Sequence, residues 1–144
     1  MRCCGFGHRS LCCDVEAELY QTLLRLADER GVTEMMTGGM GDFDRLFAST
    51  VRRIQRVRRV SLILVKPYFS SELNANRRYY EEMFDDVIVP PELLGVYPKV
   101  AIRRRNQWMV DVCDYVVTCV RRSSGGAYQA MQYAKKKGKW YGNL

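Results

Sequence analysis

The chain has few of the residues that build metal centres and catalytic centres. It contains one histidine, His8, and none of its six cysteines forms a Cys-x-x-Cys pair. A zinc site needs thiolate or imidazole ligands at workable spacing, which the adjacent pairs Cys3-Cys4 and Cys12-Cys13 do not supply. His8 has no neighbouring Cys, Asp or Glu with which to form a nucleophile–base pair. We therefore expect no metal, no cofactor and no catalytic residue, and thiols that are reduced and mostly buried.

Long apolar runs are also missing. No stretch approaches the roughly 20 apolar residues of a membrane helix, and the apolar start of the chain is too short for a signal peptide. We therefore expect a cytoplasmic protein without a membrane partner. Its 144 residues, 47% of them hydrophobic and 27% charged, suit one globular domain over 1–144.

Basic residues outnumber acidic ones. The 23 Lys and Arg residues and 16 Asp and Glu residues give a net charge of +7. This charge favours anionic partners such as nucleic acid, but solvated basic helix faces produce it as well. We take scattered basic faces as the default, with weak and nonspecific nucleic-acid contact. A dedicated DNA-binding module would need the arginines of a helix over 43–58 to join Lys135, Lys136, Lys137 and Lys139 in one continuous groove.

Segments of strand type alternate with segments of helical periodicity. The expected strands are 2–6, 33–37, 60–65, 87–89, 115–119 and a last one from 139, and the expected helices are 14–30, 43–58, 72–84, 98–112 and 127–137. Asp14 is the expected N-cap of the first helix. The alternation is typical of an α/β protein with a Rossmann-like open sheet, mostly parallel, and helices on both faces. Ligands bind at the carboxyl ends of such strands, so the loops 7–10, 38–42 and 120–126 should meet there.

The loop Thr37-Gly38-Gly39-Met40-Gly41-Asp42-Phe43-Asp44 joins a strand to a helix. A strand, a glycine turn and a helix N-terminus together are the usual build of a nucleotide site. Asp42 and Asp44 fall in the first helical turn, where carboxylates stabilise the helix but repel phosphate. We expect Asp42 to cap the helix and Asp44 to accept hydrogen bonds from sugar hydroxyls.

A second glycine turn, Ser123-Ser124-Gly125-Gly126, precedes the last helix. Its N–H groups and the helix dipole favour an anion, although a tight turn with nothing bound is an equal alternative from these residues alone. Arg9 offers a fork of donors suited to phosphate. We expect Arg9 and Gly125-Gly126 to hold a phosphate. A lone histidine such as His8 is more often structural than catalytic.

The helix over 98–112 carries a polar amide on its apolar side. Asn106 shares a face with apolar residues such as Met109. A polar amide in such a place needs partners, so Asn106 either ties to a backbone loop or faces a ligand. Arg103 and Arg104 are expected to form a solvated basic face.

Five motifs recur here in an order that resembles a known family. They are Gly7-His8-Arg9, Gly38-Gly39-x-Gly41-x-x-Asp44, Arg105-Asn106-x-Trp108-Met109-Val110-Asp111, Ser124-Gly125-Gly126-Ala127-Tyr128 and Tyr133-Ala134-x-x-x-Gly138-Lys139. Over nearly its whole length the chain resembles stand-alone SLOG-family proteins of bacteria and phages, a domain of unknown function related to YspA and YpsA. The resemblance implies a Rossmann-like fold. It also implies binding of a nucleotide or nucleotide-derived signal, of the kind made from NAD or ADP-ribose, by a sensor or sequestering protein.

The wider superfamily implies two alternatives. One is a lysine-decarboxylase-like phosphoribohydrolase, which cuts the base from nucleoside monophosphates, and the other is a DNA-processing protein, which loads recombinase on single strands. The hydrolases carry Pro-Gly-Gly-x-Gly-Thr-x-x-Glu. With their glycine pair placed on Gly125-Gly126, Tyr128 stands at the third glycine and Gln132 at the glutamate, and an amide cannot exchange a proton as a carboxyl group does. An N-glycosidase would need another carboxyl group, for which Glu81 and Glu82 are the nearest unassigned candidates.

The residues expected to bind the ligand come from these motifs. They are Gly7, His8, Arg9, Gly38, Gly39, Met40, Gly41, Asp44, Arg105, Asn106, Ser124, Gly125, Gly126 and Tyr128. The expected partner is a nucleotide-type small molecule, and a homo-oligomer is left open.

Overall fold

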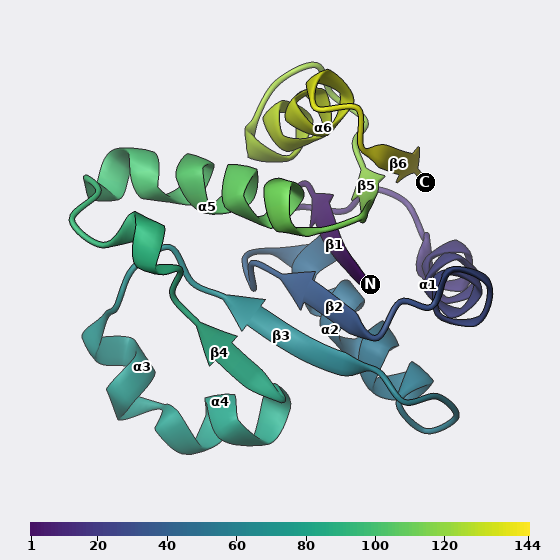
Figure 1. The fold of residues 1–144 in the computed structure, drawn as a ribbon, viewed down its shortest axis with the longest axis horizontal. Coiled ribbons are helices and arrows are strands. Elements are labelled where there is room, and N and C mark those ends of the chain that lie inside the picture. The colour runs from purple at the N-terminus through teal and green to yellow at the C-terminus, as the bar shows by residue number, and fades with distance from the viewer.

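The computed structural model describes residues 1–144 and contains one sheet of six parallel strands (Figure 1). The strands are β1 (Arg2–Gly7), β2 (Glu34–Thr37), β3 (Ser61–Val65), β4 (Asp86–Ile88), β5 (Tyr115–Cys119) and β6 (Trp140–Asn143). They lie in the order β4-β3-β2-β1-β5-β6, and every neighbouring pair is parallel. The predicted α/β fold with a Rossmann-like sheet is confirmed.

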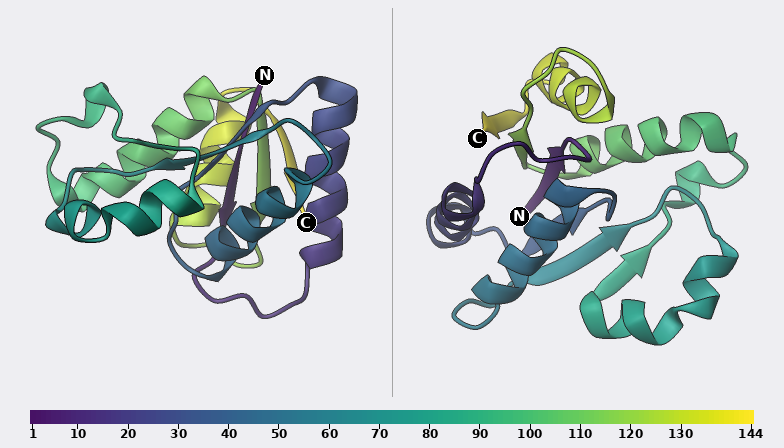
Figure 2. Two further views of the ribbon diagram at one scale, coloured as in Figure 1. Left: turned by 90° about the horizontal axis from the view of Figure 1, so that it is seen from below. Right: turned by 180° about the vertical axis from the view of Figure 1, so that it is seen from behind.

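Helices cover both faces of this sheet (Figures 1 and 2). One face carries α1 (Glu16–Arg30) and α2 (Asp42–Ile54), and the other carries α5 (Pro98–Val112) and α6 (Gly126–Lys136). Two short helices, α3 (Ser71–Ala75) and α4 (Arg77–Met83), and a 3-10 turn (Pro91–Leu93) lie between β3 and α5. No helix combines the length and the apolar character needed to cross a membrane.

Alternate side chains of each inner strand enter two separate cores. Cys3 of β1 and Met35 of β2 pack with α1 and α2, whereas Cys4 and Met36 pack with α5 and α6. Successive strand side chains point to opposite faces, and here both faces are covered by apolar helix surface. This explains why the predicted strands are nearly continuous apolar runs.

Several predicted boundaries are wrong. The helix expected over 72–84 is two short helices that meet at Asn76. The helix expected over 43–58 ends at Ile54, because the following residues fold back as turns, with the Val57 and Arg58 N–H groups both donating to the Ile54 carbonyl at 2.9 Å. Val57, which the predicted helix would have included, is therefore 54% exposed.

The predicted N-caps also differ from the structure. Helix α1 begins at Glu16 with Val15 at the N-cap, so Asp14 lies one residue further out, and its Oδ1 accepts the Glu16 N–H at 3.1 Å. Helix α2 has Gly41 at its N-cap. The expected capping role of Asp42 is wrong, since Asp42 Oδ2 instead accepts the Leu11 N–H at 3.2 Å.

The loops after β1 and β2 touch at Gly41. The Asp42 N–H donates to the Arg9 carbonyl at 2.8 Å, and a Cβ on Gly41 would lie 2.6 Å from Arg9 Cα. Gly41 also has a φ of +90°, which side chains disfavour. Only glycine allows this close approach, which places the two loops together at the carboxyl edge of the sheet.

Substitution of Gly41 by alanine should destabilise the protein more than substitution of Gly31. Gly31 ends α1 with φ +68° and open space around it, so Gly31→Ala should cost about 1 kcal/mol from backbone strain alone. Gly41→Ala adds a collision with backbone and should cost roughly 3 kcal/mol or more. Urea unfolding followed by tryptophan fluorescence gives both values, and equal losses would contradict the close approach of the two loops.

Candidate functional site

A pocket of about 380 Å³ lies where the strand order reverses, between the ends of β1 and β5. Open α/β sheets bind ligands at such a reversal. Of the residues predicted to bind the ligand, the structure brings together Gly7, His8, Arg9, Gly38, Met40, Asp44, Arg105, Asn106, Gly125 and Gly126. The three predicted loops therefore do meet at one end of the sheet.

Four of the predicted residues lie outside this pocket lining. Gly39 and Gly41 shape the loop behind it, Ser124 is exposed in the turn before α6, and Tyr128 lines a neighbouring groove. The candidate carboxyl groups of Glu81 and Glu82 lie on α4, where they form ion pairs with Arg77 and Arg78.

Asp44 is the one carboxylate of the pocket lining. Its side chain is buried, and Oδ2 accepts the Met40 N–H at 2.7 Å, which closes the glycine loop over it. Burial raises the pKa of Asp44 to about 6, although the Met40 N–H bond, the Arg105 charge and the Thr37 hydroxyl act in the opposite direction. A desolvated carboxyl group with a pKa near neutrality is a common mark of a functional site.

Arg105 is buried beside Asp44 and hydrogen-bonds to the ends of two strands next to the pocket. Its Nη1 donates to the Val65 carbonyl at 2.8 Å and to the Gly38 carbonyl at 3.3 Å. A Cβ on Gly38 would lie 2.8 Å from the guanidinium carbon of Arg105, so glycine is needed there to admit it. Burial lowers the pKa of Arg105, and the charge of Asp44 counteracts this. Arg105 thus ties α5 to the ends of β2 and β3.

Asn106 is hydrogen-bonded to a side chain and not to a backbone loop. Its Oδ1 accepts the Arg105 Nε–H at 2.8 Å, and its Nδ2 would lie 3.9 Å from a Cβ on Gly126. One end of the amide is therefore tied to Arg105, while the other end faces the start of α6 from within the pocket lining.

His8 joins the loop after β1 to the loop after β5. Its Nε2 accepts the Arg121 N–H at 3.0 Å and the Arg122 N–H at 3.3 Å, so this nitrogen carries no proton. Burial and the charges of Arg122 and Arg121 lower the pKa of His8, which keeps the ring neutral. This geometry supports the structural role expected for His8.

The start of α6 presents free donors to the pocket. Gly125, with φ +94°, is its N-cap and no side chain caps the helix, so the first-turn N–H groups have no partner within the helix. Arg9 and Arg122 also line the pocket, and neither forms an ion pair. Sequence reasoning missed Arg122. Its position in the same loop as the Ser124-Gly125-Gly126 turn could have identified it as a further candidate for binding an anion.

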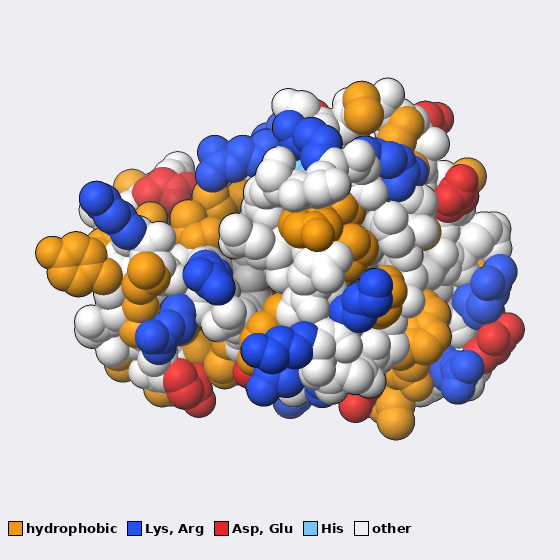
Figure 3. Space-filling model, turned by 90° about the horizontal axis from the view of Figure 1, so that it is seen from above, with side chains coloured by type: hydrophobic (Ala, Val, Ile, Leu, Met, Phe, Trp, Pro, Cys, Tyr) orange, Lys and Arg blue, Asp and Glu red, His pale blue; other side chains and the backbone are white.

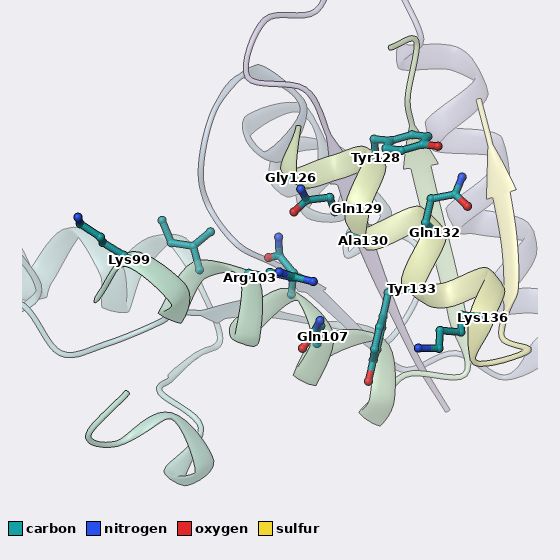
Figure 4. A pocket seen from close by; sticks show the side chains of 12 residues that line it. Lys99, Arg103, Gln107, Gly126, Tyr128, Gln129, Ala130, Gln132, Tyr133 and Lys136 are labelled. Carbon is teal, nitrogen blue, oxygen red and sulfur yellow. The ribbon is translucent and has the colours of Figure 1, made fainter. Parts of the chain in front are cut away.

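A second cavity, of about 490 Å³, adjoins the first between α5 and α6 (Figure 4). Ile102, Asn106 and Gly126 line both cavities, so the two are adjacent. Lys and Arg side chains spread over this side of the molecule, and the acidic ones lie toward its margins (Figure 3). The groove arises from the packing of two helices, and no single motif in the sequence marks it.

No His, Cys, Asp or Glu residues gather in a group that could hold a metal ion. The six cysteines are free, four of them buried, and Cys12 and Cys13 are exposed.

Comparison with known proteins connects the chain to others through its fold. No family model matches it, and no curated protein has a similar sequence. Among solved structures, it resembles DNA processing protein A from Helicobacter pylori (TM-score 0.66, 16% identity, 98% of this chain and 63% of that one). It also resembles DNA processing protein A from Streptococcus pneumoniae (TM-score 0.69, 15% identity, 97% and 48%). A third similar structure is that of the protein TM1055 (TM-score 0.61, 14% identity, 97% and 71%).

These likenesses define the class of fold. At 14–16% identity they establish the fold alone. The chain spans about half to two thirds of the length of the two DNA-processing proteins. The Helicobacter protein has been described as binding single-stranded DNA.

Asp44→Asn should change how stability depends on pH. The pKa of Asp44 is about 6 in the folded protein and ordinarily 3.8, so the group stabilises the fold most below pH 3.8, and this contribution is lost as the pH rises through about 6. The asparagine side chain carries no charge to desolvate, so the variant should gain up to about 3 kcal/mol relative to the unaltered protein at about pH 8. Its gain should be much smaller at about pH 4.5. Urea unfolding at both pH values measures the difference, and a pH-independent difference would contradict the burial of an ionisable Asp44.

Proposed function

We propose that the pocket at the carboxyl edge binds a nucleotide or nucleotide-derived small molecule, as a SLOG-type sensor or sequestering protein does. The observation that carries this proposal is the presence of both kinds of group in one cavity. Arg9, Arg122 and the first turn of α6 line the same pocket as the Asp44 carboxylate. A cationic fork and free N–H groups suit a phosphate, while a carboxylate suits the hydroxyl donors of a sugar.

The carboxyl groups near the site favour binding over hydrolysis. Glu81 and Glu82 lie on α4 in ion pairs, and Gln132 stands where the hydrolases carry glutamate. Asp44 is the single carboxyl group of the pocket, and one of its oxygens is occupied by the Met40 N–H. Since N-glycosidases of the resembled group use the motif glutamate, we do not assign this reaction to the chain.

Arg9→Ala should discriminate between a nucleotide and its nucleoside. A hydrogen bond to a charged group contributes roughly 1.5–3 kcal/mol, so the variant should bind AMP about ten- to a hundredfold more weakly and bind adenosine unchanged. Arg25→Ala removes an exposed, unpaired arginine from α1 and serves as the charge control. Calorimetric titration measures the binding of both ligands. If the protein prefers a base other than adenine, the same calorimetric titration is done with the other mononucleotides and their nucleosides. Equal losses for nucleotide and nucleoside would show that Arg9 does not bind phosphate.

Single-stranded nucleic acid is the second candidate, and the position of the unpaired cations favours it. The groove that sequence reasoning required does not form, because Arg52 and Arg53 of α2 pair with Asp85 and Glu16. Helix α2 also lies on the face opposite α6. Several unpaired cations lie instead along α5, α6 and the loop between β5 and α6, among them Lys99, Arg103, Arg122 and Lys136. The single-stranded DNA binding described for the Helicobacter protein adds to this case.

Binding of a single strand should be weak and sensitive to salt. If about three phosphates are contacted, affinity should fall roughly twentyfold between about 50 and 200 mM salt. Fluorescence anisotropy with labelled strands of different sequence measures both the salt dependence and the sequence preference. Tight binding that persists at physiological salt would make nucleic acid the principal ligand.

A further inference from the structure

The groove between α5 and α6 has the chemistry of a second ligand subsite. Arg103 and Gln107 of α5 and Tyr133 of α6 reach into the space between the two helices (Figure 4). Lys99 and Lys136 complete its basic lining. No Asp or Glu is part of this lining, so the positive charge is not neutralised within the groove.

The cations of this groove differ from several of those around α2. Arg52, Arg53 and Arg58, on or just after α2, each have an acidic partner. None of Lys99, Arg103 and Lys136 forms an ion pair. Cations left unpaired along a concave surface favour an anionic ligand, because the low-dielectric walls strengthen the field inside it.

Neutral polar groups are interspersed with these cations. Asn106, Gln107 and Gln129 provide amide donors and acceptors, and Asn106 belongs to the lining of both cavities. Amide pairs of this kind recognise the edge of a nucleobase, while arginine holds phosphate. The composition therefore suits a nucleotide unit better than an inorganic anion.

Hydrogen bonds link the last turn of α5 to residues on and after α6. The Tyr133 hydroxyl donates to the Asp111 carboxylate at 2.9 Å, and Lys139 Nζ donates to the Asp111 carbonyl at 3.2 Å. These bonds hold the two helices in place beside the groove. Asn106 and Gly126 belong to the lining of the groove and of the first pocket, so the two cavities lie next to each other.

We propose that the site binds two nucleotide units joined by phosphate, the first in the pocket at the carboxyl edge and the second in the α5–α6 groove. This inference rests on the proposed nucleotide binding and specifies its ligand. The cavity volumes of about 380 and 490 Å³ are similar, so a groove next to a one-nucleotide pocket has room for one further unit. A free dinucleotide and the end of a single strand share this chemistry.

Arg103→Ala tests the second subsite, with Arg104→Ala as the matched control. Arg104 is exposed on the same helix and lines neither cavity, so the two variants lose the same charge. Calorimetry would compare AMP with the phosphorylated dinucleotide pApA, and the corresponding pairs for the other bases. Arg103→Ala should weaken the dinucleotide about tenfold and leave the mononucleotide unchanged, and Arg104→Ala should change neither.

Each outcome bears on a different claim. If mononucleotides bind the unaltered protein normally but dinucleotides bind no more tightly, the second subsite is wrong and the proposed function stands. If neither class binds, the proposed function itself fails. Equal effects of Arg103→Ala on both ligands would also overturn the second subsite. A longer strand of the same base distinguishes a free dinucleotide from the end of a single strand. If the strand binds more tightly than the dinucleotide, the ligand is a strand end. If the two bind equally, the ligand is a free dinucleotide.

Discussion

The site depends on the hydrogen bonds that the buried guanidinium of Arg105 makes. The guanidinium joins α5 to the carbonyl groups of Gly38 and Val65, at the ends of two neighbouring strands, and lies beside the Asp44 carboxylate. A buried charge is costly unless hydrogen bonds and an opposite charge compensate it, and here both do. Without this tie, the glycine loop would lose the side chain that fills the space behind it, and α5 would lose its attachment to the sheet edge.

The pocket is built from groups whose placement opposes stability. Asp44 is desolvated although it remains ionisable, and the first turn of α6 leaves N–H groups without partners inside the helix. His8 stabilises the pocket instead. Its neutral ring joins the loop after β5 to the loop after β1 through two hydrogen bonds. The three loops are thus fixed by Arg105, His8 and the Gly41 contact, while the groups directed at the cavity stay available.

Charge is distributed unevenly over the two faces of the sheet. Three arginines on or just after α2 pair with Asp28, Asp85 and Glu16, and these exposed pairs contribute little to stability. The cations that line the two adjacent cavities at α5 and α6, such as Lys99, Arg103 and Lys136, form no such ion pair. The net charge of +7 therefore overstates how basic the face around α2 is, and it understates how basic the face with α5 and α6 is. This asymmetry explains why the arginines of α2 do not join Lys135, Lys136, Lys137 and Lys139 in one groove, as a DNA-binding module would have required.

The sequence by itself determined the fold class and the set of loops. Apolar runs separated by helical periodicity require a parallel sheet covered on both faces, and glycines after β2 and β5 mark the turns that lead into helices. Local patterns cannot report long-range packing, so the sequence did not reveal the break at Asn76 or the early end of α2. Nor did it reveal the link between Asp42 and Leu11.

The residues that line the pocket divide in the same way. The sequence pointed to Arg9, Asp44 and Gly125 because each stands in a recognisable local motif. Only the tertiary structure decided that Arg105 is buried, that Arg122 joins the pocket and that Tyr128 lies in the groove. Those properties depend on which segments meet across the sheet and between α5 and α6. Hydrogen-bond partners and desolvation are set by neighbours far away in the chain, and no spacing along the sequence encodes them directly.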